Sequence, residues 1–248
     1  MLDTQIHEMR ELEDHYWWFV ARRRIALALL DDAGLADPRM LDCGVGAGAL
    51  LQKLGSRGTA FGIDIAQVAI DVCRGRGLER LVRSDVTDAP FRAESFDAAM
   101  LLDVLEHVED DQAALDETVR LLRPGGVLVI AVPALKILWG VHDEALGHHR
   151  RYSPRRLREM LSDAGLEMEK LSFGLCFLFP VALVLRWAQR SFRRKDEAAT
   201  GLVRVPSWIN RLLIWFMDVE NAMIRRVNLP IGVSLVAVAR KPSQSPEK

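Results

Sequence analysis

The sequence predicts an α/β fold in which a mostly parallel sheet is covered by helices on both faces. Two observations predict it. Apolar segments with strand character alternate with segments of helix length, which is typical of strand–helix–strand units. A glycine-rich turn also joins the first buried strand to a short helix. The 248 residues, 50% apolar and 27% charged, suffice for a substantial core.

Seven strands are expected, after an N-terminal helical region over residues 1–38 in which Gly34 breaks the last apolar run. The domain proper is expected to span residues 39–248. Its strands are predicted at 39–43, 59–65, 80–86, 96–104, 125–134, 166–173 and 234–241.

Helices are predicted between these strands. One follows the second strand and ends near Gly77, and one runs from about 111 to 122, where RPGG stops it. A third has Ser153 as its N-cap, Pro154 at its first position and Gly165 just past its end. The last covers 206–227, with Ile209, Leu212, Leu213 and Phe216 on one face.

The glycine turn, GVGAG, directly follows the first strand. Gly44, Gly46 and Gly48 leave bare backbone where a ligand can approach and amide groups can point at it. With Ala49 they also satisfy the dinucleotide-binding spacing. The turn alone therefore leaves an NAD-dependent oxidoreductase open as an alternative.

One aspartate lies at the end of each of three successive strands. Asp42, at the mouth of the glycine turn, would repel a pyrophosphate but could accept hydrogen bonds from an ammonium group. Asp64 could accept from both hydroxyls of a ribose, and Asp85 from an exocyclic amine. The set suits a nucleoside with a cationic tail and no phosphates, and S-adenosylmethionine is such a molecule.

The motifs LDCGVGAG, GIDI, SDV, FDAAMLLDVLEHVED and LLRPGGVLVIAVP, in this order, resemble the class I S-adenosylmethionine-dependent methyltransferases over residues 39–171. The resemblance implies a Rossmann-like, seven-stranded, mostly parallel sheet with an antiparallel last strand. It also implies the cofactor-binding residues: Asp42, Gly44 and Gly46, with Gly48 completing the turn, at the methionine end, Asp64 and Ile65 at the ribose, Asp85 and Val86 at the adenine, and Leu102 at the sulfonium.

Methyl transfer needs a positioned nucleophile, and a base where a hydroxyl or amine must lose a proton. DVLEH places Asp103, Glu106 and His107 on one face if the turn is helical. It resembles the acidic-x-x-Glu-His segment of ubiquinone-biosynthesis O-methyltransferases, where a divalent metal is associated with the corresponding residues. His107 is then a general base, or the three side chains hold a Mg²⁺-type ion, or the Glu-His pair only braces the cofactor loop. We predict no resident metal, because Asp103 in place of glutamate shortens the reach.

A second cluster, residues 139–153, follows the fifth strand at the carboxyl edge, where open α/β sheets bind ligands. His148 and His149 are further candidate bases, and Arg150 or Arg151 could hold an anionic group such as phosphate. The alternative is a solvated loop whose arginines pair with nearby acids.

The cluster and residues 17–24, WWFVARRR, together resemble bacterial methyltransferases that carry both segments. Trp17 and Trp18 either form substrate walls or pack helices.

About sixty residues, 174–230, separate the last two strands, where a hairpin normally needs about 2–5. This insertion carries nine basic and four acidic residues, and its apolar start, 173–187, is too short for a membrane span and contains Pro180. It is expected to form amphipathic helices that either contact an anionic membrane peripherally or pack on the sheet as a lid or subunit contact.

The sequence thus predicts an S-adenosylmethionine-dependent methyltransferase, acting on the oxygen of an apolar or lipid-linked small-molecule acceptor. A membrane-associated scaffold that binds the cofactor without turnover is the non-enzyme alternative. A net charge of −1 gives no reason to expect a nucleic-acid partner. Three scattered cysteines and an N-terminus without a signal-peptide core predict a cytoplasmic location, with the inner face of the membrane as the site of contact.

Overall fold

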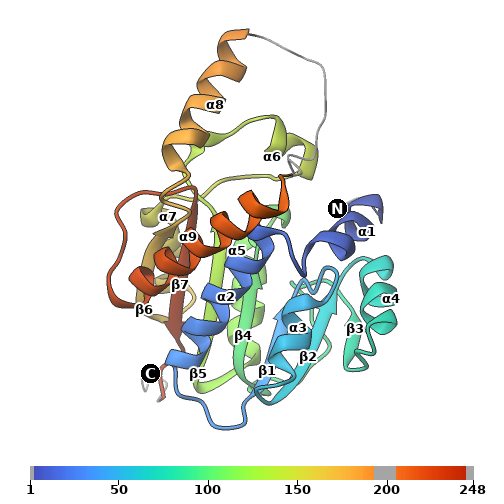
Figure 1. The fold of residues 1–248 in the computed structure, drawn as a ribbon. Coiled ribbons are helices and arrows are strands. Elements are labelled where there is room, and N and C mark those ends of the chain that lie inside the picture. The colour runs from blue at the N-terminus through green and yellow to red at the C-terminus, as the bar shows by residue number, and fades with distance from the viewer. Residues whose placement is uncertain (1–2, 193–204, 244–248) are drawn as a thin grey trace.

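The computed structural model describes residues 3–192 and 205–243, which form one seven-stranded sheet with helices on both faces (Figure 1). The strand order is β3-β2-β1-β4-β5-β7-β6, with β7 antiparallel to its neighbours β5 and β6. The strands are β1 (Arg39–Cys43), β2 (Thr59–Asp64), β3 (Leu81–Arg83), β4 (Phe96–Leu102), β5 (Leu122–Pro133), β6 (Glu167–Gly174) and β7 (Ser234–Arg240). The predicted fold class is confirmed.

Most helices lie in intervals where the sequence predicts them, whereas the helix at Val141–Leu146 falls in the second cluster, for which none was predicted. The helices are α1 (Asp3–Leu12), α2 (Trp17–Asp32), α3 (Ala49–Leu54), α4 (Gln67–Gly75), α5 (Asp111–Leu121), α6 (Val141–Leu146), α7 (Pro154–Asp163), α8 (Phe179–Phe192) and α9 (Ser207–Arg226), with short 3-10 turns η1 (Leu105–His107) and η2 (Lys136–Leu138). Ser153 caps α7 as predicted, since its hydroxyl accepts from the Arg156 amide at 3.2 Å. Most of the basic segment 191–205 of the predicted insertion lies outside the described residues.

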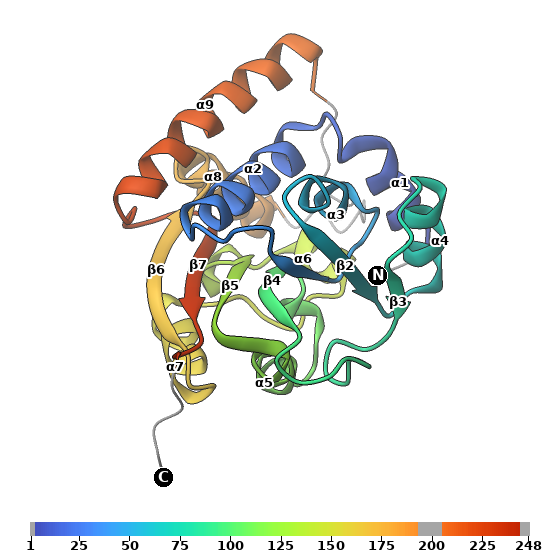
Figure 2. The ribbon, with the colours of Figure 1, turned by 90° about the horizontal axis from the view of Figure 1, so that it is seen from below.

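Two apolar layers enclose the sheet. One contains Leu115, Leu157 and Leu161 from α5 and α7, and the other contains Leu29 of α2 and Leu54 of α3. Seen from below, α2, α3 and α9 lie on one side of the sheet and α5 and α7 on the other (Figure 2). The N-terminal helical region is packed on the sheet through α2, which is buried on several sides because it lies between the sheet and α9.

Helix α9 is built into the fold through α2. Its Met217 and Ile224 are buried, and the Asn221 side chain donates to the Ala21 carbonyl at 3.1 Å. Arg225 pairs with Asp32 of α2. The face predicted from the sequence is not the buried one, because Leu212 and Phe216 are largely exposed.

Helix α8 projects beyond the carboxyl edge of the sheet, together with α6 (Figure 1). Pro180 does not break it, because the helix begins at Phe179 and proline is tolerated in a first turn. Since β6 runs parallel to β5, Gly174 and the start of the insertion lie directly at this edge. The helices in the described ranges are each too short or too polar to cross a bilayer.

Candidate active site

A cavity of about 1000 Å³ lies at the carboxyl edge of the sheet. The segments that follow β1, β2 and β4 line one part of it, and α1, α2 and α6 line another. Ala182 of α8 also contributes to the lining. The cavity therefore joins the predicted cofactor loop to the N-terminal helices and to the insertion.

Eight of the nine predicted cofactor residues line this cavity: Asp42, Gly44, Gly46, Asp64, Ile65, Asp85, Val86 and Leu102. Gly48 is not among the lining residues. A Cβ atom there would lie 2.8 Å from the Cys73 sulfur, so this glycine allows α3 to pack closely against α4.

The glycine turn is fixed by the neighbouring strand. The amides of Gly44 and Val45 both donate to the Ile63 carbonyl, at 2.8 and 3.0 Å. Gly44 has φ of +77°, and a Cβ atom on it would lie 2.6 Å from the Val104 side chain. Only glycine fits here, because a side chain would be strained and would also collide with the segment after β4.

Asp42 and Asp64 lie side by side at the end of the sheet. Asp42 is buried, and its Oδ2 atom has no hydrogen-bond partner among the described residues. Burial, and then the nearby Asp64 and Glu13 carboxyls, raise the pKa of Asp42 well above its ordinary value. Asp64 accepts from the Gly46 amide at 3.1 Å and the Ala66 amide at 2.9 Å, and burial raises its pKa as well. This wall of the cavity is rich in acceptors and short of donors.

Asp85 and Ile65 lie at the more open part of the cavity. Asp85 is exposed and accepts from the amide and hydroxyl of Thr87, both at 2.9 Å. Ile65 exposes 63% of its surface. An apolar side chain this exposed, beside an acid, provides a flat surface on which a purine ring could rest.

His148 is held by a buried carboxylate. Its Nδ1 atom lies 3.0 Å from Oδ1 of Asp143, which is fully buried in α6. Arg151 donates to the same oxygen at 2.7 Å. Burial alone would raise the pKa of Asp143, but the hydrogen bonds from His148 and Arg151 and the charge of Arg151 outweigh it, so the pKa is lowered. A charged Asp143 fixes both the orientation and the tautomer of His148.

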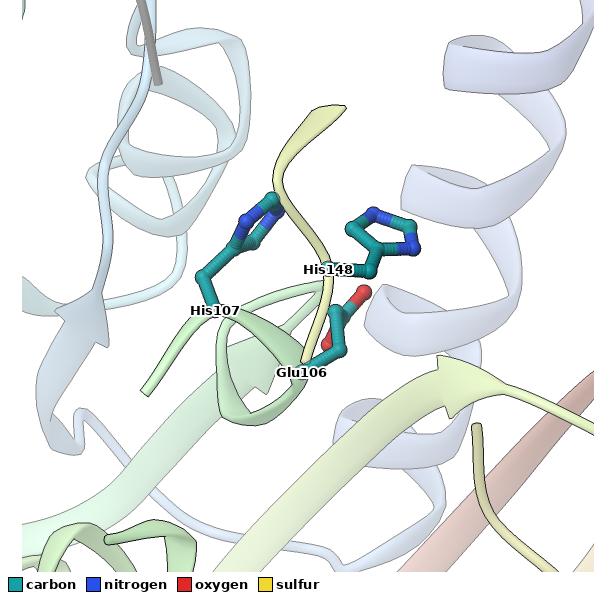
Figure 3. A group of neighbouring side chains, drawn as sticks. All are labelled: Glu106, His107 and His148. Carbon is teal, nitrogen blue, oxygen red and sulfur yellow. The ribbon is translucent and has the colours of Figure 1, made fainter. Parts of the chain in front are cut away.

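Glu106 and His107, in η1, face the same histidine. Glu106 has no exposed surface, and neither carboxyl oxygen has a hydrogen-bond partner among the described residues. Burial raises the pKa of Glu106 to about 7. Burial, and then the proximity of His148, lower the pKa of His107 to about 4, so that its imidazole is neutral at physiological pH. Figure 3 shows the Glu106 carboxyl pointing toward His148.

Asp103 does not join Glu106 and His107 on one helical face. Its φ of +57° places it before the helical turn, and it forms an ion pair with Arg22 of α2. Arg22 also donates to the Ser234 hydroxyl at 3.0 Å and stacks over Trp18. The turn is 3-10 and short, so the spacing that would align the three residues on an α-helix does not apply.

Among the remaining residues of the second cluster, Val141, His142, Leu146 and Arg151 also line the cavity, whereas two of the candidates lie outside it. His149 is exposed and is not part of the cavity lining. Arg150 pairs with Asp111 at 2.8 Å and with the Glu109 carbonyl at 2.7 Å. Arg151 pairs with Asp143, so both arginines form ion pairs within the protein. This pairing with nearby acids is what the alternative to anion binding predicts.

Glu106, His107 and His148 are the group that could hold a metal ion. One ligand atom of each lies within 4.8 Å of the others (Figure 3). His148 thus takes the place that the sequence interpretation gave to Asp103. Sequence reasoning missed Glu13. It singled out the segments that contain Arg22 and Asp143 but gave neither residue its role, because their contacts are made between segments that no local motif connects.

Comparisons with known proteins agree with this geometry. Residues 41–130 match the family model described as a methyltransferase domain. A ubiquinone biosynthesis O-methyltransferase of Xanthomonas oryzae pv. oryzae is 36% identical over 160 residues, which cover 56% of this chain and 66% of that relative. The match therefore spans slightly less than two thirds of the relative's length. A protein of the same description from Xanthomonas axonopodis pv. citri is 35% identical over 167 residues, which cover 58% and 68% of the two chains.

The fold has close counterparts among solved structures. A SAM-dependent methyltransferase of Thermotoga maritima superposes with a TM-score of 0.63, over 96% of this chain and 95% of its own, at 17% identity. The sheet order and the ligand cavity at its carboxyl edge define an α/β enzyme that uses a nucleoside cofactor. The chain belongs to the S-adenosylmethionine-dependent methyltransferase family.

The family decides between the two cofactors that the glycine spacing allowed, in favour of S-adenosylmethionine over NAD. The cavity fits this molecule. Its buried Asp42 oxygen lacks a donor within the part of the chain that the structure describes, as a site for a cationic ligand requires. A pyrophosphate would lie against the carboxyls of Glu13, Asp42 and Asp64 on that wall.

Proposed function

We propose that the protein transfers the methyl group of S-adenosylmethionine to a hydroxyl oxygen of an apolar or lipid-linked small molecule. The observation that carries this proposal is the buried Asp143–His148 pair in the wall of the cofactor cavity. An imidazole held in this way is suited to remove a proton from a hydroxyl. The O-methyltransferase descriptions of the matched relatives support oxygen as the acceptor atom.

In this proposal the eight predicted cofactor residues that line the cavity hold the cofactor. Asp42 accepts from the ammonium group, Asp64 from the ribose and Asp85 from the adenine, while Gly44 and Gly46 allow close approach of the backbone. When bound, S-adenosylmethionine supplies an electrophilic methyl group. The protein has to place the acceptor oxygen in line with it and remove the proton.

His148 is the preferred base among the three candidate histidines. Because the Asp143 carboxylate accepts a hydrogen bond from the Nδ1–H group, Nε2 is the basic nitrogen. His107, with a pKa lowered to about 4, is a weaker base, and His149 lies outside the lining. The Glu106 carboxyl beside His148 is suited to stabilise the imidazolium after proton uptake.

The walls around this base support an apolar acceptor. Tyr16, Trp17, Trp18 and Phe19 from the start of α2 line the cavity, and Ala182 brings the insertion to it. Trp17 and Trp18 therefore belong to the wall as well as to helix packing. Such a lining favours an apolar molecule with a single polar end.

The test is incubation of the full chain with labelled S-adenosylmethionine and a cellular lipid extract, followed by mass spectrometry. We expect a methyl group on a hydroxyl oxygen of an apolar product. His148→Gln should lower kcat by about 10²–10⁴-fold while leaving S-adenosylhomocysteine binding unchanged. His149→Gln is the matched control and should retain activity.

Two outcomes would contradict the proposal: methylation on nitrogen or carbon, or full turnover by His148→Gln. Treatment with EDTA distinguishes proton removal by His148 from activation of the acceptor by a metal ion that the same side chains hold. Since we assign proton removal to His148 alone, turnover should survive EDTA.

We further propose that the insertion contacts an anionic membrane, on its cytoplasmic face. One side of α9 carries an exposed apolar stripe, which we call the outer stripe: Trp208, Leu212, Trp215, Val219 and Met223. Exposed Arg211 and Arg226 flank it, within a segment of net charge +5 from nine basic and four acidic residues. Tryptophans and arginines on one side of a helix suit the interface of an anionic bilayer.

Co-sedimentation with vesicles tests the membrane contact. Binding should require anionic lipid and should weaken with salt. The double variant Trp208→Ser, Trp215→Ser should lose most of the binding, whereas Met168→Ser, an exposed apolar residue on β6, should not. Equal binding to neutral vesicles, or insensitivity to salt, would reject the electrostatic contact.

A further inference from the structure

Helix α1 lies over the glycine turn and closes one side of the cofactor cavity. Ile6 is buried, and the Met9 sulfur lies 2.9 Å from where a Cβ atom on Gly46 would be. Arg23 of α2 donates to the Glu13 carbonyl at 2.8 Å and ties the end of α1 in place. This helix lies outside residues 41–130, which match the methyltransferase model.

Two charged side chains from α1 and its end line the cavity, Glu8 and Glu13, and Glu13 is the buried one. It is 6% exposed, and its Oε2 atom accepts from the Ala49 amide at 3.3 Å. Its Oε1 atom is paired with Arg76, whose side chain is itself buried. A carboxylate has about four acceptor sites, so these two contacts leave room for a donor from the cavity.

Three carboxyls therefore meet at one end of the cavity: Glu13, Asp42 and Asp64. They are close enough that Asp64 and Glu13 both raise the pKa of Asp42, and burial raises the pKa of Glu13 to about 7. Of the basic side chains, Arg76 is paired with one of the three. This excess of buried negative charge is stabilised when a ligand brings a cation.

We infer that Glu13 is a further cofactor-binding residue, which accepts a hydrogen bond from the ammonium group of the amino-acid end of S-adenosylmethionine. Arg76 and the Ala49 amide hold the carboxylate in position, and Asp42 accepts from the same ammonium. The inference depends on the cofactor and not on the proposed acceptor. The role of Glu13 and the identity of the acceptor are therefore tested separately.

Calorimetry with two ligands tests this inference on the full chain. S-Adenosylhomocysteine carries the ammonium group, whereas 5′-methylthioadenosine shares the nucleoside and thioether but lacks the amino-acid end. Glu13→Gln should weaken S-adenosylhomocysteine binding on the order of tenfold and leave methylthioadenosine binding unchanged. Glu11→Gln, on the exposed side of α1, is the matched control and should change neither.

A purely structural role for Glu13 predicts a different pattern. If it only latches α1 over the cavity, both ligands should weaken alike, and that result would overturn the inference, as would an unchanged S-adenosylhomocysteine affinity. Should Glu13→Gln fail to fold, Glu13→Asp keeps the charge but shortens its reach. It should lower the ratio of the two affinities in the same direction, and an unchanged ratio would also overturn the inference.

Discussion

At the scale of single residues, the site is built from ionisable groups removed from water. Glu106 is the extreme case, because it has no exposed surface and lies beside two histidines. A carboxyl in such a place holds its proton more tightly in the folded protein than in the unfolded chain. Its ionisation near neutral pH is therefore linked to stability.

We expect Glu106→Gln to be more stable than the wild type at alkaline pH. The pKa of Glu106 is raised to about 7 in the folded state, above its ordinary value of about 4.3 when unfolded. The stabilisation from holding this proton is complete at acidic pH and is lost as the pH rises through about 7. The variant should gain about 1–3 kcal/mol over the wild type near pH 8.5, and little near pH 4.

Urea unfolding at several pH values measures this effect. A difference between the two proteins that does not change with pH would contradict it. Asp116→Asn, on the exposed side of α5, is the control. Asp110 is unsuitable for this purpose because its side chain caps the same helix.

The sequence located some of these residues and not others, for a physical reason. Asp42, Asp64 and Asp85 each lie at or just past the carboxyl end of a strand. Because the carboxyl ends of parallel strands meet at one edge, local pattern was sufficient to bring them to one cavity. Asp143 and Glu13 have no such signal. Their contacts with His148 and Ala49 depend on how α6 and α1 fold back over that edge, which no periodicity encodes.

At the scale of elements, α9 has two unlike faces. Met217 and Ile224 are buried against α2 and the sheet, while the outer stripe is exposed. Sequence periodicity identified the helix but not its buried face, because apolar residues occur on both sides. Deleting the whole insertion would therefore uncover α2, so only α8 can be shortened without disturbing the core.

Truncating each face of α9 should separate these roles. Ile224→Ala should cost about 2–4 kcal/mol, because it leaves a cavity in the apolar layer. Val219→Ala, one turn away on the outer stripe, should cost about 0.5 kcal/mol or less. Urea denaturation with an unchanged m-value measures both, and equal costs would mean that α9 is not docked as described.

At the scale of the whole molecule, the cavity couples the N-terminal helices, the sheet and the insertion. Its lining comes from α1 and α2, from the ends of β1, β2, β3 and β4, and from α6 and α8. Ligand binding should therefore stabilise the entire fold rather than one loop.

A ligand at about 100 times its Kd adds about 2.7 kcal/mol to the free energy of unfolding. For a chain of this length, S-adenosylhomocysteine should raise Tm by about 5–10 °C in a thermal-shift measurement. NAD at the same concentration should give no shift, because its pyrophosphate would meet the acidic wall. A comparable shift with NAD would reopen the question of the cofactor.

The antiparallel direction of β7 has a consequence for how this architecture can diversify. β6 ends and β7 begins at the edge where the cofactor loops lie. A segment inserted between these strands therefore reaches the cavity without altering the strand register. We expect that lengthening or replacing the inserted segment changes which acceptors can enter, while the residues that hold the methyl donor are left intact. Acceptor choice could then evolve at this hairpin independently of the cofactor site.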